Sequence, residues 1–91
     1  MKKLRFEEFQ EGILTLLQAT SVKGKIYHDF SIQNGKVRFK RSGKSTYEYI
    51  DLDELYSLYC KVDRPTNTQA RAYVTGRVQS PAVSIINALS R

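Results

Sequence analysis

The sequence predicts an α+β fold: an N-terminal helix, a three-stranded antiparallel β-meander, and then two or three C-terminal helices. Two observations predict this class. Apolar residues recur with helical spacing in the first twenty residues and again after residue 51, whereas between residues 25 and 50 they alternate with polar residues, as in a strand. The length of 91 residues allows a single compact domain over residues 1–91 with a modest core.

The first predicted element is an amphipathic helix over residues 6–20. Its apolar face comprises Phe6, Phe9, Ile13, Leu16, Leu17 and Thr20. Glu7, Glu8 and Glu11 lie near its start, where the helix dipole stabilises negative charge. Gly12 in the middle destabilises this helix by up to about 1 kcal/mol relative to Ala.

The next predicted element is a β-hairpin, with strands on both sides of Asn34-Gly35, the dipeptide preferred in two-residue type I′ turns. Such a turn fixes the register: Gln33 opposite Lys36, Ile32 opposite Val37, Ser31 opposite Arg38, Phe30 opposite Phe39, and Asp29 opposite Lys40. One face is then apolar and contains Ile26, His28, Phe30 and Ile32. The other face carries Lys36, Arg38 and Lys40 in a row.

A second turn at residues 42–44 leads to a third strand over residues 45–50, with Tyr47 and Tyr49 on the same face. Asp51 is predicted to begin a helix, because Glu54 three residues later completes a capping-box pattern. This helix ends near Lys61, before the break at residues 63–65.

Residues 66–78 fit two structures. With period two, small residues form a strand face; with helical period, Thr66 and Gln69 form a capping box and Gly76 stops the helix in a left-handed conformation. The helix is favoured because its start and stop signals both fit. Ser80-Pro81 is predicted to open the last helix, as N-cap and first helical residue. The buried stripe of that helix would be Ala82, Ile85, Ile86 and Leu89.

Positive charge is concentrated in the hairpin region. Residues 23–44 contain seven Lys or Arg and one acid, a net charge of +6, which equals the formal charge of the whole chain. A basic two-stranded ribbon suits contacts with phosphates. The alternative is a solvated sheet face whose lysines protect an edge strand from pairing. The candidate phosphate-binding residues are Lys36, Arg38, Lys40, Arg41 and Lys44.

The C-terminal segment resembles the generic helix-turn-helix layout, in which a small residue, a glycine turn and a second helix follow one another. Ala72, Gly76 and the helix after Gln79 fit these places, although Arg71 and Thr75 fall where such helices are usually apolar. The outward side of the last helix would show Ser80, Val83, Ser84 and Asn87. Arg71, Arg77, Ser84 and Asn87 are the candidate nucleic-acid-binding residues of this helix pair. A plain helical hairpin that closes the core explains the same pattern.

Tyr47 and Tyr49 have two interpretations. On an outward face beside the basic strand they could stack on unpaired bases. Packing against the flanking helices is the favoured interpretation, because a small sheet needs large residues in its core.

Catalysis is not expected. His28 is interpreted as a packing residue and Cys60 as a small buried hydrophobe. The carboxylates of Glu48, Asp51, Asp53 and Glu54 only faintly resemble a metal-dependent nuclease site, and Asp51 and Glu54 are better explained as helix caps. No disulfide, metal site, cofactor, signal peptide or membrane span is predicted. A cytoplasmic location is therefore expected.

These features together predict a small non-enzymatic nucleic-acid-binding protein that uses the basic hairpin and the C-terminal helix pair, with DNA favoured over RNA. The alternative is a protein-interaction module, an inhibitor or accessory subunit, that docks its basic ribbon on an acidic protein surface. A homodimer through a strand edge or helix face is compatible with either, since a short meander leaves unpaired edges.

Overall fold

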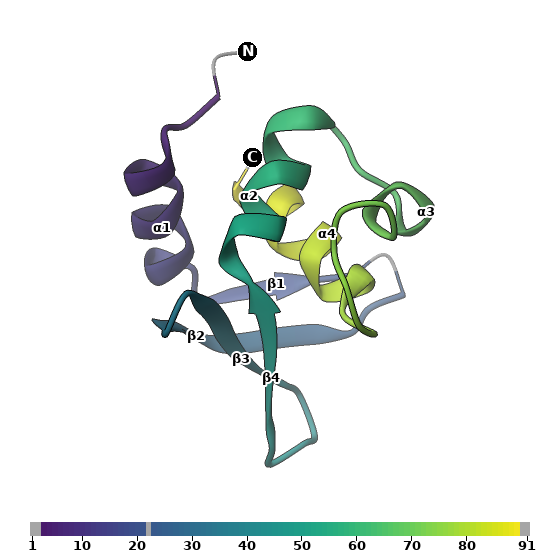
Figure 1. Cartoon of the computed structure of the whole chain (residues 1–91). Helices are drawn as coiled ribbons and strands as arrows, with labels where there is room; N and C mark the ends of the chain where they lie inside the picture. Colours follow the sequence, from purple (N-terminus) through teal and green to yellow (C-terminus); the bar gives the residue numbers. More distant parts are fainter. Residues whose placement is uncertain (1–2, 22, 90–91) are drawn as a thin grey trace.

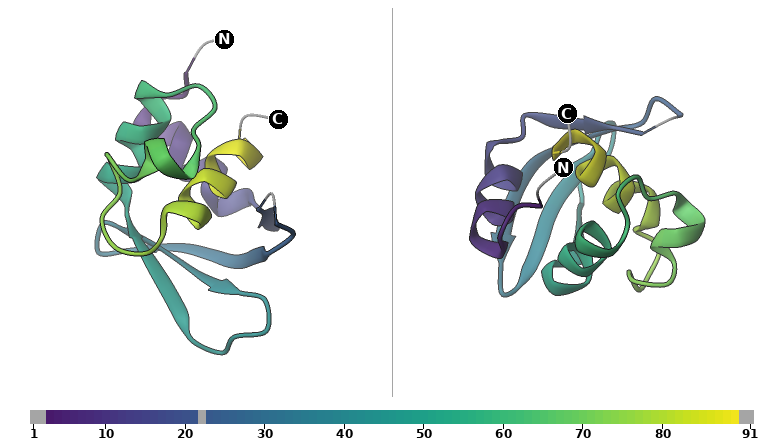
Figure 2. Two further views of the ribbon diagram at one scale, coloured as in Figure 1. Left: turned by 90° about the vertical axis from the view of Figure 1, so that its right-hand side faces the viewer. Right: turned by 90° about the horizontal axis from the view of Figure 1, so that it is seen from above.

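The computed structural model describes residues 3–21 and 23–89, which form a sheet covered by helices (Figure 1). The antiparallel sheet has the strand order β1 (Gln18–Thr20), β2 (Ile26–Gln33), β3 (Lys36–Arg41), β4 (Tyr47–Asp51). The helices are α1 (Phe6–Thr15), α2 (Leu52–Lys61), α3 (Asn67–Ala70) and α4 (Gln79–Leu89). They lie on one side of the sheet, in front of it in the right-hand view of Figure 2. The α+β class and the meander are confirmed, with one more strand than predicted.

The extra strand comes from residues predicted to be helical. α1 ends at Thr15, and Leu16 has the extended angles φ −67° and ψ 128°. The chain then pairs Gln18–Thr20 with β2, and reciprocal bonds between Ser21 and Lys25 close the turn. This path turns Ala19 into the core, where its side chain is 2% exposed, and leaves Leu17 on the surface at 89% exposed. The prediction that Leu17 and Thr20 lie on a buried helical face was therefore wrong.

The predicted hairpin forms, and its register is confirmed from the turn as far as Ser31 and Arg38. Beyond that pair the register shifts, because Asp29 and Phe30 together oppose the single residue Phe39. Such a β-bulge interrupts the alternation of side chains along a strand. The predicted Asp29–Lys40 pair was wrong, because His28 lies opposite Lys40 instead. Phe30 shares its place opposite Phe39 with Asp29, but the predicted contact of the two phenylalanine rings forms, with their centroids 6.2 Å apart.

The bulge exchanges two side chains between the faces of the sheet. Tyr27, predicted to face away from the apolar side, is fully buried against the helices. Its ring meets Phe39 edge-on, with the centroids 5.7 Å apart. His28, predicted to lie on the apolar side, is half-buried on the opposite face, at the same level as Lys40.

The C-terminal half follows its capping signals more closely than its periodicity. The Asp51 carboxylate accepts from the Glu54 N–H at the start of α2, and Thr66 and Gln69 form the predicted capping box at α3. However, α3 has only 4 residues, so the favoured long helix over residues 66–78 does not form, and neither does the alternative strand. Gly76 adopts the predicted left-handed conformation, with φ +83°. α4 begins at Gln79, so Ser80 and Pro81 lie inside it and not at its cap.

The helices enclose one core against the sheet. Val37, Phe39 and Ile50 point from the sheet into it and are at most 1% exposed. Ile85 and Ile86 of α4 are fully buried, as predicted, whereas Leu89 is only partly buried. The prediction that Cys60 is buried was wrong, because its side chain is exposed on α2. This arrangement of the helices leaves the opposite face of the sheet uncovered (Figure 2).

Candidate nucleic-acid interface

The uncovered side of the sheet carries three cations in a row. Since cross-strand partners share a face, the pairing of β2, β3 and β4 defines a surface that we call the open face: His28, Lys40 and Tyr47 in one row, Ser31, Arg38 and Tyr49 in the next, and Gln33, Lys36 and Asp51 in the third. Lys36 is exposed, and Arg38 and Lys40 are half-buried. The prediction that these three cations share one strand face is confirmed.

The two tyrosines of β4 lie on the open face and not in the core. Tyr47 is 37% exposed and Tyr49 is 50% exposed. The favoured interpretation, packing against the helices, was therefore wrong. Alternation explains the outcome: Ile50 takes the inward position, so Tyr47 and Tyr49 face away from the helices.

Tyr47 organises the neighbouring cations. The Arg38 guanidinium lies 4.0 Å from the centroid of the Tyr47 ring, and the Lys40 ammonium lies 4.7 Å from it. Arg38 Nε also donates to Ser31 Oγ at 3.1 Å. Cation–π contacts and this hydrogen bond restrict long side chains that would otherwise sample many rotamers.

Arg41, predicted to grip phosphate with its neighbours, does not share their face. Its side chain points to the other side of β3, next to Glu48 of β4. Nη2 donates to Glu48 Oε1 at 3.1 Å, and Nε lies 3.0 Å from Oε2. The guanidinium also lies 5.5 Å from the centroid of the buried Tyr27 ring. This ion pair neutralises Arg41, so the row on the open face consists of Lys36, Arg38 and Lys40.

Lys44 lies in the exposed turn between β3 and β4, away from the helices (Figure 1). Its N–H donates to the Arg41 carbonyl, and Gly43 before it has φ +86°. The turn that was predicted at residues 42–44 is confirmed. Lys44 therefore extends positive charge beyond the end of the basic row.

The C-terminal candidates lie in a different place. The helix-turn-helix layout does not form, because a loop stands where its first helix would continue. Thr75 of this loop donates through its N–H and hydroxyl to Glu54 Oε1, at 3.1 and 3.0 Å, so α2 holds the loop. Arg71 and Arg77 are exposed in the segment that joins α3 and α4, which belongs to the helical layer (Figure 1).

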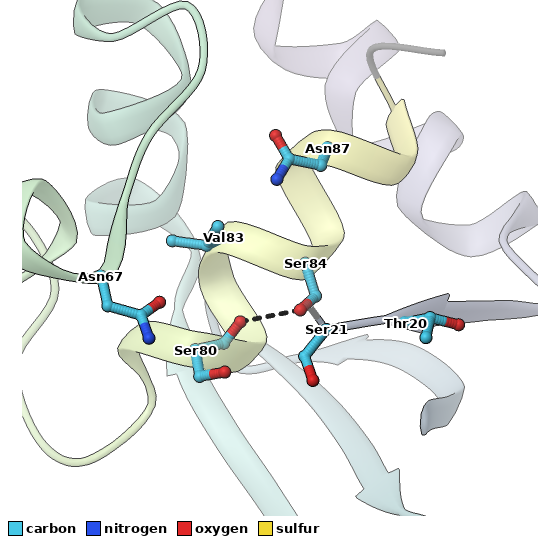
Figure 3. Close-up of a pocket in the computed structure, with 7 residues that line it drawn as sticks. All are labelled: Thr20, Ser21, Asn67, Ser80, Val83, Ser84 and Asn87. Atoms are coloured by element: carbon cyan, nitrogen blue, oxygen red, sulfur yellow. Dashed lines mark hydrogen bonds between the residues drawn. The ribbon is translucent and has the colours of Figure 1, made fainter. Parts of the chain in front are cut away.

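The side of α4 predicted to face outward is largely covered. Ser84 is 3% exposed and donates to the Ser80 carbonyl at 2.9 Å, and Val83 is also buried. Figure 3 shows both beside a hollow of about 180 Å³, lined by uncharged side chains of Thr20, Ser21, Asn67, Ser80, Val83, Ser84 and Asn87. β1 and α3 cover this side of α4, so an exposed base-reading position for Ser84 was wrong. The lining offers no cation to a phosphate.

The carboxylates considered for catalysis have structural partners. Glu48 pairs with Arg41, Asp51 caps α2, and Glu54 binds the loop at Thr75. Among residues 3–21 and 23–89, no three His, Cys, Asp or Glu side chains lie close enough together to hold a metal ion. The helices of the described ranges are all too short or too polar to span a bilayer.

Comparisons with known proteins do not place the chain in a family: no family model, curated protein or solved structure matches it. The functional argument therefore rests on the open face itself. Sequence reasoning found its three cations but missed His28, whose place depends on the bulge. The bulge residue Asp29 has a φ of 59°, and because φ cannot be read from the sequence, no sequence signal located the bulge.

Proposed function

We propose that the protein binds nucleic acid through the open face. The observation that carries the proposal is the row of Lys36, Arg38 and Lys40 on a sheet surface that no helix covers. Each cation that neutralises a phosphate releases condensed counterions, which favours binding at physiological salt. Two carboxylates accompany these cations: Asp51 belongs to the open face, and the Asp29 carboxylate lies 3.2 Å from Nδ1 of His28.

The alternative explanation of the basic row, lysines that protect an edge strand from pairing, agrees less well with the structure. Lysines protect a sheet when they lie on its edge strand, but β3 is an inner strand, paired on both sides by β2 and β4. Its cations therefore have no edge to protect. In addition, Tyr47 fixes two of them in defined positions, which a merely solubilising charge does not need.

A charge-matched pair of variants tests the proposal. The first is Lys36→Gln/Arg38→Gln/Lys40→Gln; the second, Arg64→Gln/Arg71→Gln/Arg77→Gln, removes the same formal charge from exposed positions off the open face. We expect the first variant to lose most affinity for DNA, with the slope of log K against log salt falling in magnitude by about 2 to 3. The second should keep most of both. Equal losses of affinity in both variants would mean that binding depends on net charge alone. A larger loss in the second variant would place the contact on the helical side.

A protein partner is the second candidate, because exposed tyrosines beside cations are also typical of protein interfaces. Purification from the native host after nuclease treatment separates the two candidates. A stoichiometric acidic protein, together with no measurable affinity of the purified chain for nucleic acid at low salt, would favour the second candidate.

A further inference from the structure

Tyr49 is the least explained large side chain of the open face. It is 50% exposed, and its side chain makes no hydrogen bond or ring contact with another described residue. It lies opposite Arg38 and is flanked along β4 by Tyr47 and Asp51. An aromatic ring that is open to solvent beside a cation offers a flat surface on which a planar, uncharged group can stack.

Tyr47 has a different place in the arrangement. Its ring already carries Arg38 at 4.0 Å and Lys40 at 4.7 Å. These contacts hold both cations at Tyr47, the next outward-facing residue to Tyr49 along β4. Tyr47 is thus suited to position the cations, while Tyr49 remains available to a ligand.

The shape of the open face does not suit the grooves of a duplex. Adjacent strands lie about 4.8 Å apart, so the three strands of the open face span about 10 Å between their outer backbones, and their side chains widen this further. The major groove of B-DNA is about 12 Å wide and admits a helix or a two-stranded ribbon. The cations lie on the face of an inner strand and not at its tip, so a duplex could reach them only with its outer backbone.

Stacking on Tyr49 also favours separated bases, because a ring needs an uncovered base face. Stacked bases in a duplex strand are about 3.4 Å apart. A base on Tyr49 must therefore leave the stack of its neighbours, which costs least in a strand that is already unpaired.

We propose, on the basis of the nucleic-acid-binding function above, that the ligand of the open face is a single-stranded segment. One unstacked base lies on the ring of Tyr49, and the adjacent phosphates contact Lys36, Arg38 and Lys40. Tyr47 is a positioning residue that holds Arg38 and Lys40. The structure favours no particular base, because every base presents a face that can stack.

Fluorescence anisotropy with labelled oligonucleotides tests this inference. The probes are an oligothymidylate and an oligouridylate of about 12 nucleotides, within the usual range for one single-strand site, and a duplex with the same number of phosphates. We expect the wild-type protein to bind at least one single strand about ten-fold or more tightly than the duplex. The two single-stranded probes distinguish DNA from RNA.

Two variants separate stacking from charge. Tyr49→Leu should weaken single-strand binding about ten-fold, without changing the salt slope, because it removes a stacking surface and no cation. Lys36→Gln should lower the magnitude of that slope by about 0.7. For the positioning role, Tyr47→Leu should weaken binding, whereas Tyr47→Phe, which keeps the ring under Arg38 and Lys40, should restore it. Circular dichroism of each variant checks that the fold is intact.

The outcomes distinguish this inference from the proposed function. Equal or tighter binding of the duplex, with Tyr49→Leu at wild-type affinity, would overturn single-strand recognition and leave nucleic-acid binding in place. No measurable binding of the wild-type protein to any probe at low salt would overturn both. Selective single-strand binding that is lost in Tyr49→Leu would support both.

Discussion

Asp29 determines which side chains reach the open face. Its φ of 59° lies in the left-handed region, which Asp enters more readily than most residues other than Gly. The resulting bulge sends Tyr27 into the core and His28 to the open face. The sequence could not reveal which of these side chains is buried, because Ile26, Tyr27 and His28 are each compatible with the buried or the open side of the sheet. The choice depends on where an extra residue interrupts the alternation.

We predict that Asp29→Val lowers the free energy of unfolding by about 1–2 kcal/mol, because a β-branched residue is strained at this φ. Asp29→Asn should lie within about 0.5 kcal/mol of wild type, since Asn tolerates the same conformation. Urea unfolding followed by circular dichroism measures both. Equal stability of the two variants would mean that the bulge imposes no demand on residue 29.

Two hydrogen bonds near the N-terminus join residues that are far apart in the sequence, and sequence periodicity does not predict such bonds. Tyr56 donates its hydroxyl to the Leu4 carbonyl at 2.8 Å, and the Leu4 N–H donates to the Tyr59 hydroxyl at 3.0 Å. Desolvation raises the pKa of the Tyr56 phenol, and a hydrogen bond with Cys60 adds to the shift. Tyr59 belongs to the core, and Tyr56 packs against it. The bonds of Tyr56 and Tyr59 to Leu4, 52 and 55 positions away, depend on tertiary structure alone.

At the scale of elements, local signals predicted starts and turns better than lengths. The Asn34-Gly35 turn, the Asp51 cap and the Thr66 capping box all form where predicted. α1 is shorter than its apolar pattern suggested because pairing with β2 satisfies the backbone of Gln18–Thr20. Such pairing is a long-range interaction that competes with helix propensity, and a helical spacing of apolar residues does not exclude it.

Gly12 is explained by the packing of two elements. A Cβ at this position would lie 2.9 Å from Leu89 Cδ2, so the glycine lets the end of α4 approach α1 closely. We predict that Gly12→Ala changes the free energy of unfolding by less than about 1 kcal/mol, because the gain in helix propensity offsets the contact with a flexible leucine. Gly12→Val should cost about 1–3 kcal/mol by overpacking. Thermal and urea unfolding measure both variants. A Val variant as stable as the Ala variant would show that Leu89 moves aside without a cost in stability.

For the whole molecule, the charge is divided between two sides. The sequence predicts a basic hairpin and a basic C-terminal segment, and the structure separates them. Lys36, Arg38 and Lys40 lie on the open face, whereas Arg71 and Arg77 lie in the helical layer. The sequence predicted the basic row because strand alternation is local. It could not predict that the two regions lie apart, since this depends on how α4 packs between β1 and α3.

Asp51 connects the fold to the proposed interface, because it caps α2 and lies opposite Lys36 on the open face. Asp51→Asn keeps an N-cap acceptor but removes the negative charge. We predict that it tightens binding of single-stranded oligonucleotides about two- to five-fold, the effect of one unit charge a few ångströms from a phosphate in water. The weaker interaction with the helix dipole should cost about 0.3–1 kcal/mol of stability. Anisotropy titrations at low and at physiological salt measure the gain, which should shrink as salt screens it.

Asp53→Asn is the matched control for this prediction, since it removes the same charge from the first turn of α2 without touching the open face. We expect it to change affinity less than Asp51→Asn at every salt concentration. Equal gains in both variants would make the effect one of net charge and would give the open face no special role. An unchanged affinity in Asp51→Asn would mean that no phosphate passes close to Lys36, and the path of the strand would then be restricted to the rows of Arg38 and Lys40.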